Sequence, residues 1–174
     1  MPFFPPMISV APLQTALLSW LEPPHMGPMW FEGPARLRHR LLLREYQLQD
    51  NRNAVRQILW VNTLPLQPQA AVEKLRRARE VLLPGGRILV AQPALSTEER
   101  GIFSQLWLHL GGYRESTTLT TLFLQAQLAP IIQIWPQGMR SWLLTLSAPG
   151  LPISHVFPAK FSCLQTNLRP GGTQ

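Results

Sequence analysis

Three polar residues follow two strongly apolar stretches, and their side chains could contact a ligand. Asn62 and Thr63 come directly after the run ILWV at 58–61. Gln92 follows the run ILVA at 88–91. If both runs are parallel strands, these residues lie at the carboxyl ends of the strands, where open α/β sheets bind their ligands. We therefore predict ligand contacts at Asn62, Thr63 and Gln92, with a structural alternative for Asn62 in which its amide caps the loop.

A second candidate site is the basic stretch RLRHRLLLREYQ at residues 36–47. An extended chain would place its arginines at alternate positions on one face, where guanidinium groups can bind the phosphates of a nucleic acid or an acidic partner. The competing interpretation is a solvated strand edge, at which like charges discourage incorrect pairing. The arginines concerned are Arg36, Arg38, Arg40 and Arg44.

The histidines and the cysteine do not form a recognisable catalytic or metal-binding motif. The single cysteine, Cys163, excludes an internal disulfide and a Cys-rich metal site, so we expect a cytoplasmic protein without a metal. His155 lies eight residues before it, without a second pair of ligands. No histidine is accompanied by a carboxylate or serine in a catalytic motif, and we assign no catalytic residue. The histidines are His25, His39, His109 and His155.

Composition predicts one mildly basic domain. The chain has 174 residues and a net charge of +7, but only 14% of its residues are charged. Such a surface attracts phosphates, acidic proteins or anionic lipid. The apolar stretch at 7–21 contains Pro12, Gln14 and Thr15 and is shorter than the roughly 18–20 residues that a membrane span needs, so we expect no span.

The clearest structural pattern is a strand, helix and strand at residues 57–95. The run at 58–61 has no polar alternation, as expected for a strand covered by helices on both faces. A helix is predicted over 68–83, because one apolar stripe recurs at helical spacing and charged residues cover the other side. Pro84, Gly85 and Gly86 then end the helix before the second strand. The stripe comprises Ala71, Leu75, Ala78 and Leu82.

Prolines divide the chain into three predicted regions. Their density in residues 1–35 predicts an N-terminal segment without long helices or inner strands, although 13–21 could form a short helix. An apolar group within it would pack on the domain as a strap. Residues 36–149 form the predicted α/β domain, and 150–174 an irregular C-terminal tail. The apolar group comprises Met26, Met29, Trp30 and Phe31.

The second half of the domain is predicted to contain a helix and a hairpin. The pattern STEE at 96–99 is a capping box and predicts a helix that continues to Gly111. Imperfect alternation predicts a long strand over 117–128. A turn at 136–138 could then return residues 141–147 as an antiparallel strand, while 131–135 fits no element clearly.

The run VLLPGGRI at 81–88 resembles the "vLkPGGrl" turn of class I S-adenosylmethionine-dependent methyltransferases. The helix at 100–110 with its Gly-Gly-Tyr exit, and SWLLTLSAP at 141–149, resemble that family's last helix and closing strand. The resemblance covers 57–149. It implies an α/β fold: a partial Rossmann-like methyltransferase sheet, mostly parallel with an antiparallel C-terminal hairpin. It also places Asn62 after the fourth strand, at a position that often faces the substrate.

The chain departs from that family where the cofactor would bind. The family's first strand ends in a glycine-rich loop, but only Gly27 and Gly33 precede residue 57, each next to a proline. Asp50 could match the family's acidic residue, although a surface turn at 50–53 is the simpler interpretation. We therefore predict a methyltransferase-like domain without a recognisable cofactor loop, a pseudoenzyme that acts as a non-catalytic binding or scaffold protein with a protein partner.

Two alternatives remain open. The first is an active methyltransferase with a divergent cofactor site, in which Asn62 and Gln92 lie near the substrate; S-adenosylmethionine remains possible on that hypothesis, although we assign no cofactor. The second is a basic RNA-binding or complex-assembly protein that uses the arginines of residues 36–44. Binding of S-adenosylmethionine would favour the enzyme, while RNA affinity that falls steeply with salt would favour the second alternative.

Overall fold

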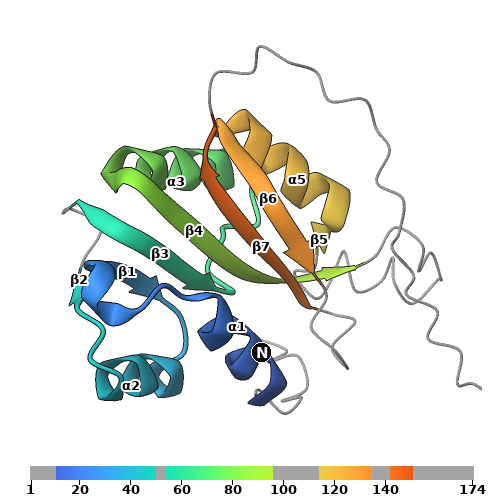
Figure 1. The fold of residues 1–174 in the computed structure, drawn as a ribbon. Helices are drawn as coiled ribbons and strands as arrows, with labels where there is room; N and C mark the ends of the chain where they lie inside the picture. Colours follow the sequence, from blue (N-terminus) through green and yellow to red (C-terminus); the bar gives the residue numbers. More distant parts are fainter. Residues whose placement is uncertain (1–10, 50–53, 96–113, 135–141, 151–174) are drawn as a thin grey trace, which may run out of the picture.

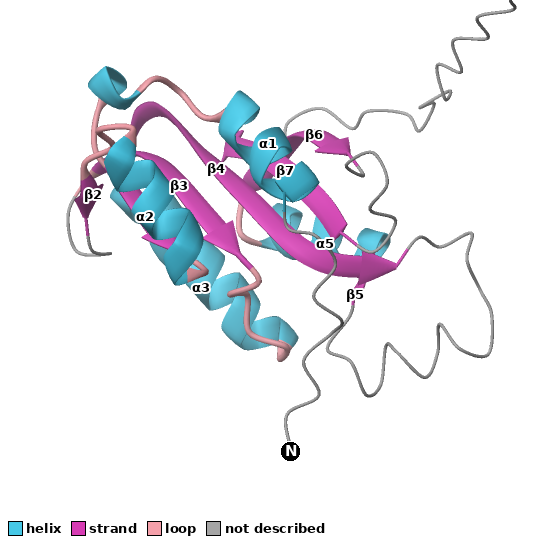
Figure 2. Ribbon diagram, turned by 90° about the horizontal axis from the view of Figure 1, so that it is seen from below, coloured by secondary structure: helices cyan, strands magenta, loops and turns pink. Residues whose placement is uncertain are grey.

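The computed structural model describes residues 11–49, 54–95, 114–134 and 142–150. These residues form one mixed β-sheet with helices on both faces (Figure 1). Helices α1 (Ala11–Trp20) and α2 (Ala35–Leu43) cover one face, and α3 (Pro68–Val81) and α5 (Ser116–Gln125) cover the other, as Figure 2 shows from below. A short 3-10 helix, η1 (Pro24–Met26), follows α1. The two apolar cores therefore lie on opposite sides of the sheet.

The sheet has the strand order β2-β1-β3-β4-β7-β6, and the short β5 pairs with the end of β4. Strands β1 to β5 pair in parallel, while β7 is antiparallel to both β4 and β6. The prediction of a mostly parallel sheet with an antiparallel C-terminal hairpin is confirmed. The strands are β1 (Met29–Glu32), β2 (Leu48–Gln49), β3 (Val55–Val61), β4 (Leu82–Leu95), β5 (Arg114–Glu115), β6 (Leu128–Ile134) and β7 (Trp142–Pro149).

The predicted unit of strand, helix and strand corresponds to β3, α3 and β4. Ile58 and Trp60 pack in the core under α3, while Leu59 and Val61 pack in the core on the opposite face. Burial on both faces explains why the strand shows no polar alternation. Helix α3 ends at Val81, two residues earlier than expected, and β4 begins before the Pro-Gly-Gly segment instead of after it.

The proline-rich start contributes an inner strand, contrary to the sequence prediction. Strand β1 lies between β2 and β3 and pairs in parallel with both. Pro28 and Pro34 flank this strand and do not interrupt it, and the carbonyl of Pro28 accepts hydrogen bonds from the amides of Arg56 and Gln57. The apolar group that includes Met29 and Trp30 is thus part of the sheet and its cores, not a strap laid over them.

Residues 35–43 form helix α2, so the prediction of an extended basic strand is wrong. Leu37 and Leu41 are buried, and their spacing of four residues puts them on one side of a helix. Arginine and leucine are both good helix formers, and Pro34 precedes the first turn, where its missing amide costs nothing. The alternation of arginines therefore does not describe the local structure.

The predicted strand over 117–128 is also wrong, because residues 116–125 form helix α5. Leu119, Leu122 and Phe123 are buried at spacings of three and four residues, as expected for one helix face. The following strand β6 takes in most of 131–135, which the sequence left unassigned. Its antiparallel pairing with β7 confirms the predicted hairpin.

Glu22 joins the end of α1 to the amino ends of β3 and β4. Its carboxylate accepts hydrogen bonds from Arg56, at 2.9 Å from Nε, and from Arg87. Its backbone carbonyl accepts hydrogen bonds from Tyr46 Oη and from Gln57 Nε2, at 2.9 and 3.3 Å. Leu13 and Leu17 of α1 are buried in the core on this face of the sheet.

Several predicted features lie outside the described residues. These are the turn with Asp50, the capping box at 96–99 and its helix, the turn at 136–138, and the tail beyond Gly150 with His155 and Cys163.

Candidate functional site

The topology defines a switch point at the carboxyl ends of β1 and β3. From β1 the chain passes through α2 to β2 on one side, and it then returns to β3 on the other side of β1. Ligands of open α/β sheets bind where the strand order reverses in this way. Glu32 ends β1, and Asn62 directly follows β3. This edge of the sheet is therefore the candidate site.

The structure brings the three predicted ligand contacts to this edge. Gln92 Nε2 donates a hydrogen bond to Asn62 Oδ1 at 3.1 Å, and the Asn62 amide donates to the Ala91 carbonyl at 2.8 Å. Asn62 has φ 56°, a left-handed conformation that asparagine tolerates better than most residues. Its side chain is exposed, whereas Gln92 is buried. Asn62 thus supports the turn after β3 and still faces solvent.

Lys74 lies at the same edge, although its position in the helix pattern assigned it to the solvent side of α3. Its ammonium Nζ is 2.5 Å from Glu32 Oε2 and 2.9 Å from the Thr63 carbonyl oxygen. It also lies 4.5 Å from the ring centroid of Trp60, a cation–π contact. A long lysine side chain can carry its charge away from the direction of its own Cα, which the helix pattern does not record.

The connection between β1 and α2 has only one glycine, Gly33, followed by Pro34. A Cβ atom on Gly33 would lie 3.0 Å from Phe31 Cζ and 3.1 Å from Val61 Cβ, so apolar side chains already fill the space beside this backbone. The turn thus differs from a glycine-rich loop that leaves its amides open to a ligand.

Arg114 is a polar residue of this edge that the sequence analysis missed. Its side chain is buried, with 6% of the residue exposed, and Nη2 donates a hydrogen bond to the Pro65 carbonyl. Its Nη1 has no hydrogen-bond partner among the described residues. Burial lowers the pKa of the Arg114 guanidinium, because a low-dielectric environment disfavours its charged form. No sequence motif marks this arginine, since its burial depends on the pairing of β5 with β4.

The four arginines of the basic stretch do not form a row. Arg36 and Arg40 are one helical turn apart on α2, and Arg44 follows at its C-terminal cap, but Arg38 points to another side of the helix. All four are exposed, and Arg40 donates a hydrogen bond to Gln14 Oε1 of α1. The structure therefore keeps them near one another but not on one face.

Within the described parts of the chain, no group of three or more His, Cys, Asp or Glu residues could hold a metal ion. Among the helices described here, none has the length and apolar character needed to cross a bilayer.

Comparison with known proteins establishes the fold. No family model and no curated protein matches the sequence. Solved structures do match, among them human N-acetylserotonin methyltransferase in complex with SAM, with a TM-score of 0.62 and 15% identity over 79% of this chain and 52% of that chain. PigF with SAH gives a TM-score of 0.57 and 13% identity over 80% of this chain and 61% of that one.

An O-methyltransferase family 2 protein from Planctomyces limnophilus, in complex with apigenin, gives a TM-score of 0.52 and 18% identity over 70% of this chain and 42% of that chain. The chain thus spans about half the length of the structures it matches. At these identities the likeness concerns architecture alone. The chain has a class I methyltransferase-like fold, in the partial, Rossmann-like form that the sequence predicted.

Proposed function

We propose that this chain is a methyltransferase-like domain that binds or scaffolds a partner without catalysing methyl transfer. One observation carries the proposal: at the switch point, where a cofactor would bind, the Lys74 ammonium contacts the Glu32 carboxylate, the Thr63 carbonyl and the Trp60 ring. The Lys74 ammonium thus already occupies the carboxylate of Glu32 and the carbonyl of Thr63 at this edge.

The residues at the switch point do not fit S-adenosylmethionine. This cofactor carries a sulfonium and an ammonium group, and either cation would have to displace Lys74 from Glu32 to use that carboxylate. Displacement would break a partly buried ion pair and a cation–π contact, at a cost of about 1–3 kcal/mol. On the other side of the β1 end, Phe31 and Val61 fill the space beside Gly33.

The runner-up is an active methyltransferase with a divergent cofactor site. Two observations favour it: Asn62 and Gln92 meet at the carboxyl ends of β3 and β4, and similar solved structures are described with SAM or SAH. On this hypothesis the two amides would orient a substrate, and orientation would supply most of the rate enhancement. RNA binding through the arginines of α2 remains a third alternative.

Calorimetric titration with S-adenosylmethionine and with S-adenosylhomocysteine tests the proposal. We expect no binding heat at millimolar ligand in a folded sample. The variant Lys74→Gln removes the cation from the switch point, and Arg77→Gln, an exposed position on the same helix, is its matched control. Micromolar binding to the wild-type protein would overturn the proposal and favour the enzyme. A gain of weak binding in Lys74→Gln alone would support Lys74 as the group that occupies the site.

A titration with a fluorescent RNA oligonucleotide tests the third alternative, RNA binding through the arginines of α2. If RNA binds through α2, its affinity should fall steeply with salt, and Arg36→Gln with Arg40→Gln should weaken it more than Arg77→Gln. Our proposal predicts no specific RNA binding in this assay.

A further inference from the structure

Arg114 is a buried cation without an anionic partner among the residues that the structure describes. The ion pairs among the described residues involve Arg56, Arg87, Lys74 and Arg77, and none involves Arg114. Glu115 follows it directly but forms no ion pair with it. A buried guanidinium without a counter-charge is costly, so proteins seldom keep one unless a charge or ligand compensates it.

Two helix N-termini begin beside this guanidinium. Arg114 Nη2 donates a hydrogen bond to the Pro65 carbonyl, α3 begins three residues after Pro65, and α5 begins two residues after Arg114. Neither helix has a side chain that caps its N-terminus, and neither has an acidic residue in its first turn. Helix N-termini carry partial positive charge, so both helices add to the positive potential around Arg114.

Other unsatisfied polar atoms belong to the same edge of the sheet. Gln92 Oε1, Thr63 Oγ1 and Trp60 Nε1 are buried without hydrogen-bond partners in the part of the chain that the structure describes. Thr63 follows β3, Gln92 lies within the last part of β4, and β5 pairs with β4 at Ala94 opposite Arg114. Buried polar groups are normally satisfied, so these atoms are free to bond with a ligand or with water.

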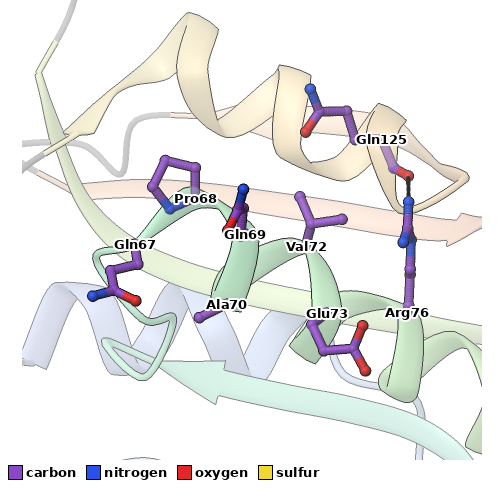
Figure 3. A pocket seen from close by; sticks show the side chains of 8 residues that line it. All are labelled: Gln67, Pro68, Gln69, Ala70, Val72, Glu73, Arg76 and Gln125. Atoms are coloured by element: carbon purple, nitrogen blue, oxygen red, sulfur yellow. Dashed lines mark hydrogen bonds between the residues drawn. The ribbon is translucent and has the colours of Figure 1, made fainter.

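A cleft lies between the first part of α3 and the C-terminal end of α5. Its volume is about 790 Å³. Figure 3 shows Gln67, Pro68 and Gln69 at the start of α3 lining one end of the cleft, and Arg76 bonded to Gln125 at the other. Its charged lining residues are Arg76 and Glu73, and the Glu73 carboxylate is paired with Arg77. The cleft begins at the N-terminus of α3 and offers room there for a small ligand, while Arg114 and the N-terminus of α5 are not among its lining residues.

We propose that Arg114 and the N-termini of α3 and α5 bind the anionic group, a phosphate or a carboxylate, of a small-molecule ligand. The guanidinium supplies two parallel N–H donors that suit either anion. Gln92 Oε1 is an acceptor and would instead pair with a hydroxyl or amino group of the same ligand. Arg114 takes no part in the contact between Lys74 and Glu32, so the proposal does not depend on whether the domain binds S-adenosylmethionine.

The test uses the full chain and measures Tm in sodium phosphate and in sodium acetate, each against sodium chloride of matched ionic strength. We expect phosphate or acetate to raise the wild-type Tm by about 5–10 °C at one hundred times its Kd. The salt that gives the larger rise in Tm identifies which anion the site prefers. Phosphorus-31 line broadening gives a direct measure of phosphate binding that does not depend on unfolding.

The variant Arg114→Met should lose the response while its Tm in chloride stays the same or rises, because the substitution removes an uncompensated buried charge. The control Arg77→Met, at an exposed position of α3, should keep the full response. If Arg114→Met fails to fold, Arg114→Lys keeps the charge but not the paired donors and should weaken the response at least tenfold in Kd. Equal Tm values in all three salts, or an unchanged response in Arg114→Met, would overturn the proposal.

Discussion

The substitution Glu22→Gln tests how the N-terminal part of the fold is held to the sheet. Glu22 is 5% exposed, and its carboxylate accepts hydrogen bonds from Arg56 and Arg87. Glutamine keeps the shape and one acceptor but removes the negative charge between two guanidinium groups. Removing one partner of a fully buried ion pair costs about 3–5 kcal/mol. The two arginine side chains are 24% and 36% exposed, so water can solvate their charges in part and reduce this cost. We therefore expect Glu22→Gln to lower the free energy of unfolding by about 2–3 kcal/mol.

Urea denaturation measures this change in the free energy of unfolding without adding guanidinium ions that would screen the charges. The control is Glu73→Gln, whose ion pair with Arg77 is exposed at both ends and should contribute under about 0.5 kcal/mol. The expected fall in Tm for Glu22→Gln is about 5–10 °C for a domain of this size. Equal effects of the two substitutions would refute the reasoning.

The pH dependence of the stability difference between wild type and Glu22→Gln gives a second check. Burial raises the pKa of the Glu22 carboxyl, but hydrogen bonds from Arg56 and Arg87 outweigh it, so the pKa lies below its ordinary value of 4.5. A depressed pKa means that the stabilisation is fully present above the unfolded pKa and is lost as the pH falls through the folded one. The difference between wild type and Glu22→Gln should therefore be constant from pH 6 to 8 and shrink below about pH 4.5. A difference that persists unchanged into that acid range would contradict an ionic origin.

Three further substitutions test the packing. Gly86→Ala would place a Cβ 2.8 Å from two backbone oxygens and should cost about 1–3 kcal/mol in urea denaturation, whereas Gly150→Ala, with its nearest neighbour at 3.5 Å, should be nearly neutral. Leu75→Ala creates a cavity in the core under α3 and should cost about 2–5 kcal/mol, while the exposed Leu124→Ala should change stability by less than about 0.5 kcal/mol. Ile132→Lys charges an exposed position of the edge strand β6, so it should leave stability unchanged and reduce aggregation on heating, as measured by light scattering.

The sequence predicted the elements in which burial leaves a simple pattern. The run before Asn62 was recognised as an inner strand because both of its faces are covered, and α3 was recognised because its apolar stripe follows the helical period. The closing hairpin followed from the resemblance and is present as β6 and β7. In each case local pattern and tertiary context favour the same structure.

The wrong predictions come from segments in which two patterns overlap. In α2 the alternating arginines suggest a strand, but only Leu37 and Leu41 are buried, and their spacing is helical. In α5 the threonines favour a strand, yet Leu119, Leu122 and Phe123 bury one helical face. Strand β1 was missed because prolines surround it, although its own four residues contain none. Tertiary burial decided each case, and the sequence alone does not state which apolar residues become buried.

The sequence predicted those residues of the candidate site that follow an apolar run, and it missed the others. Asn62, Thr63 and Gln92 were found because they follow apolar runs, and the structure places them at one edge. Lys74 was not found, since it lies on the charged side of a helix and reaches Glu32 across 42 residues of sequence. Arg114 belongs to a two-residue strand with no periodic pattern of its own.

Glu22 and Arg114 are both buried charges, and their surroundings assign them different roles. Glu22 has two cationic partners and its backbone is bonded to Gln57 and Tyr46, so its charge is compensated by the fold itself. Among the described residues, the Arg114 side chain bonds to one backbone carbonyl, that of Pro65, and to no anion. A compensated charge stabilises the folded state in any buffer, whereas an uncompensated one stabilises it only when an anion is bound. Glu22→Gln should therefore lower Tm equally in all three salts, while Arg114→Met should leave Tm the same or raise it in chloride and lower it in the salt of the anion that binds.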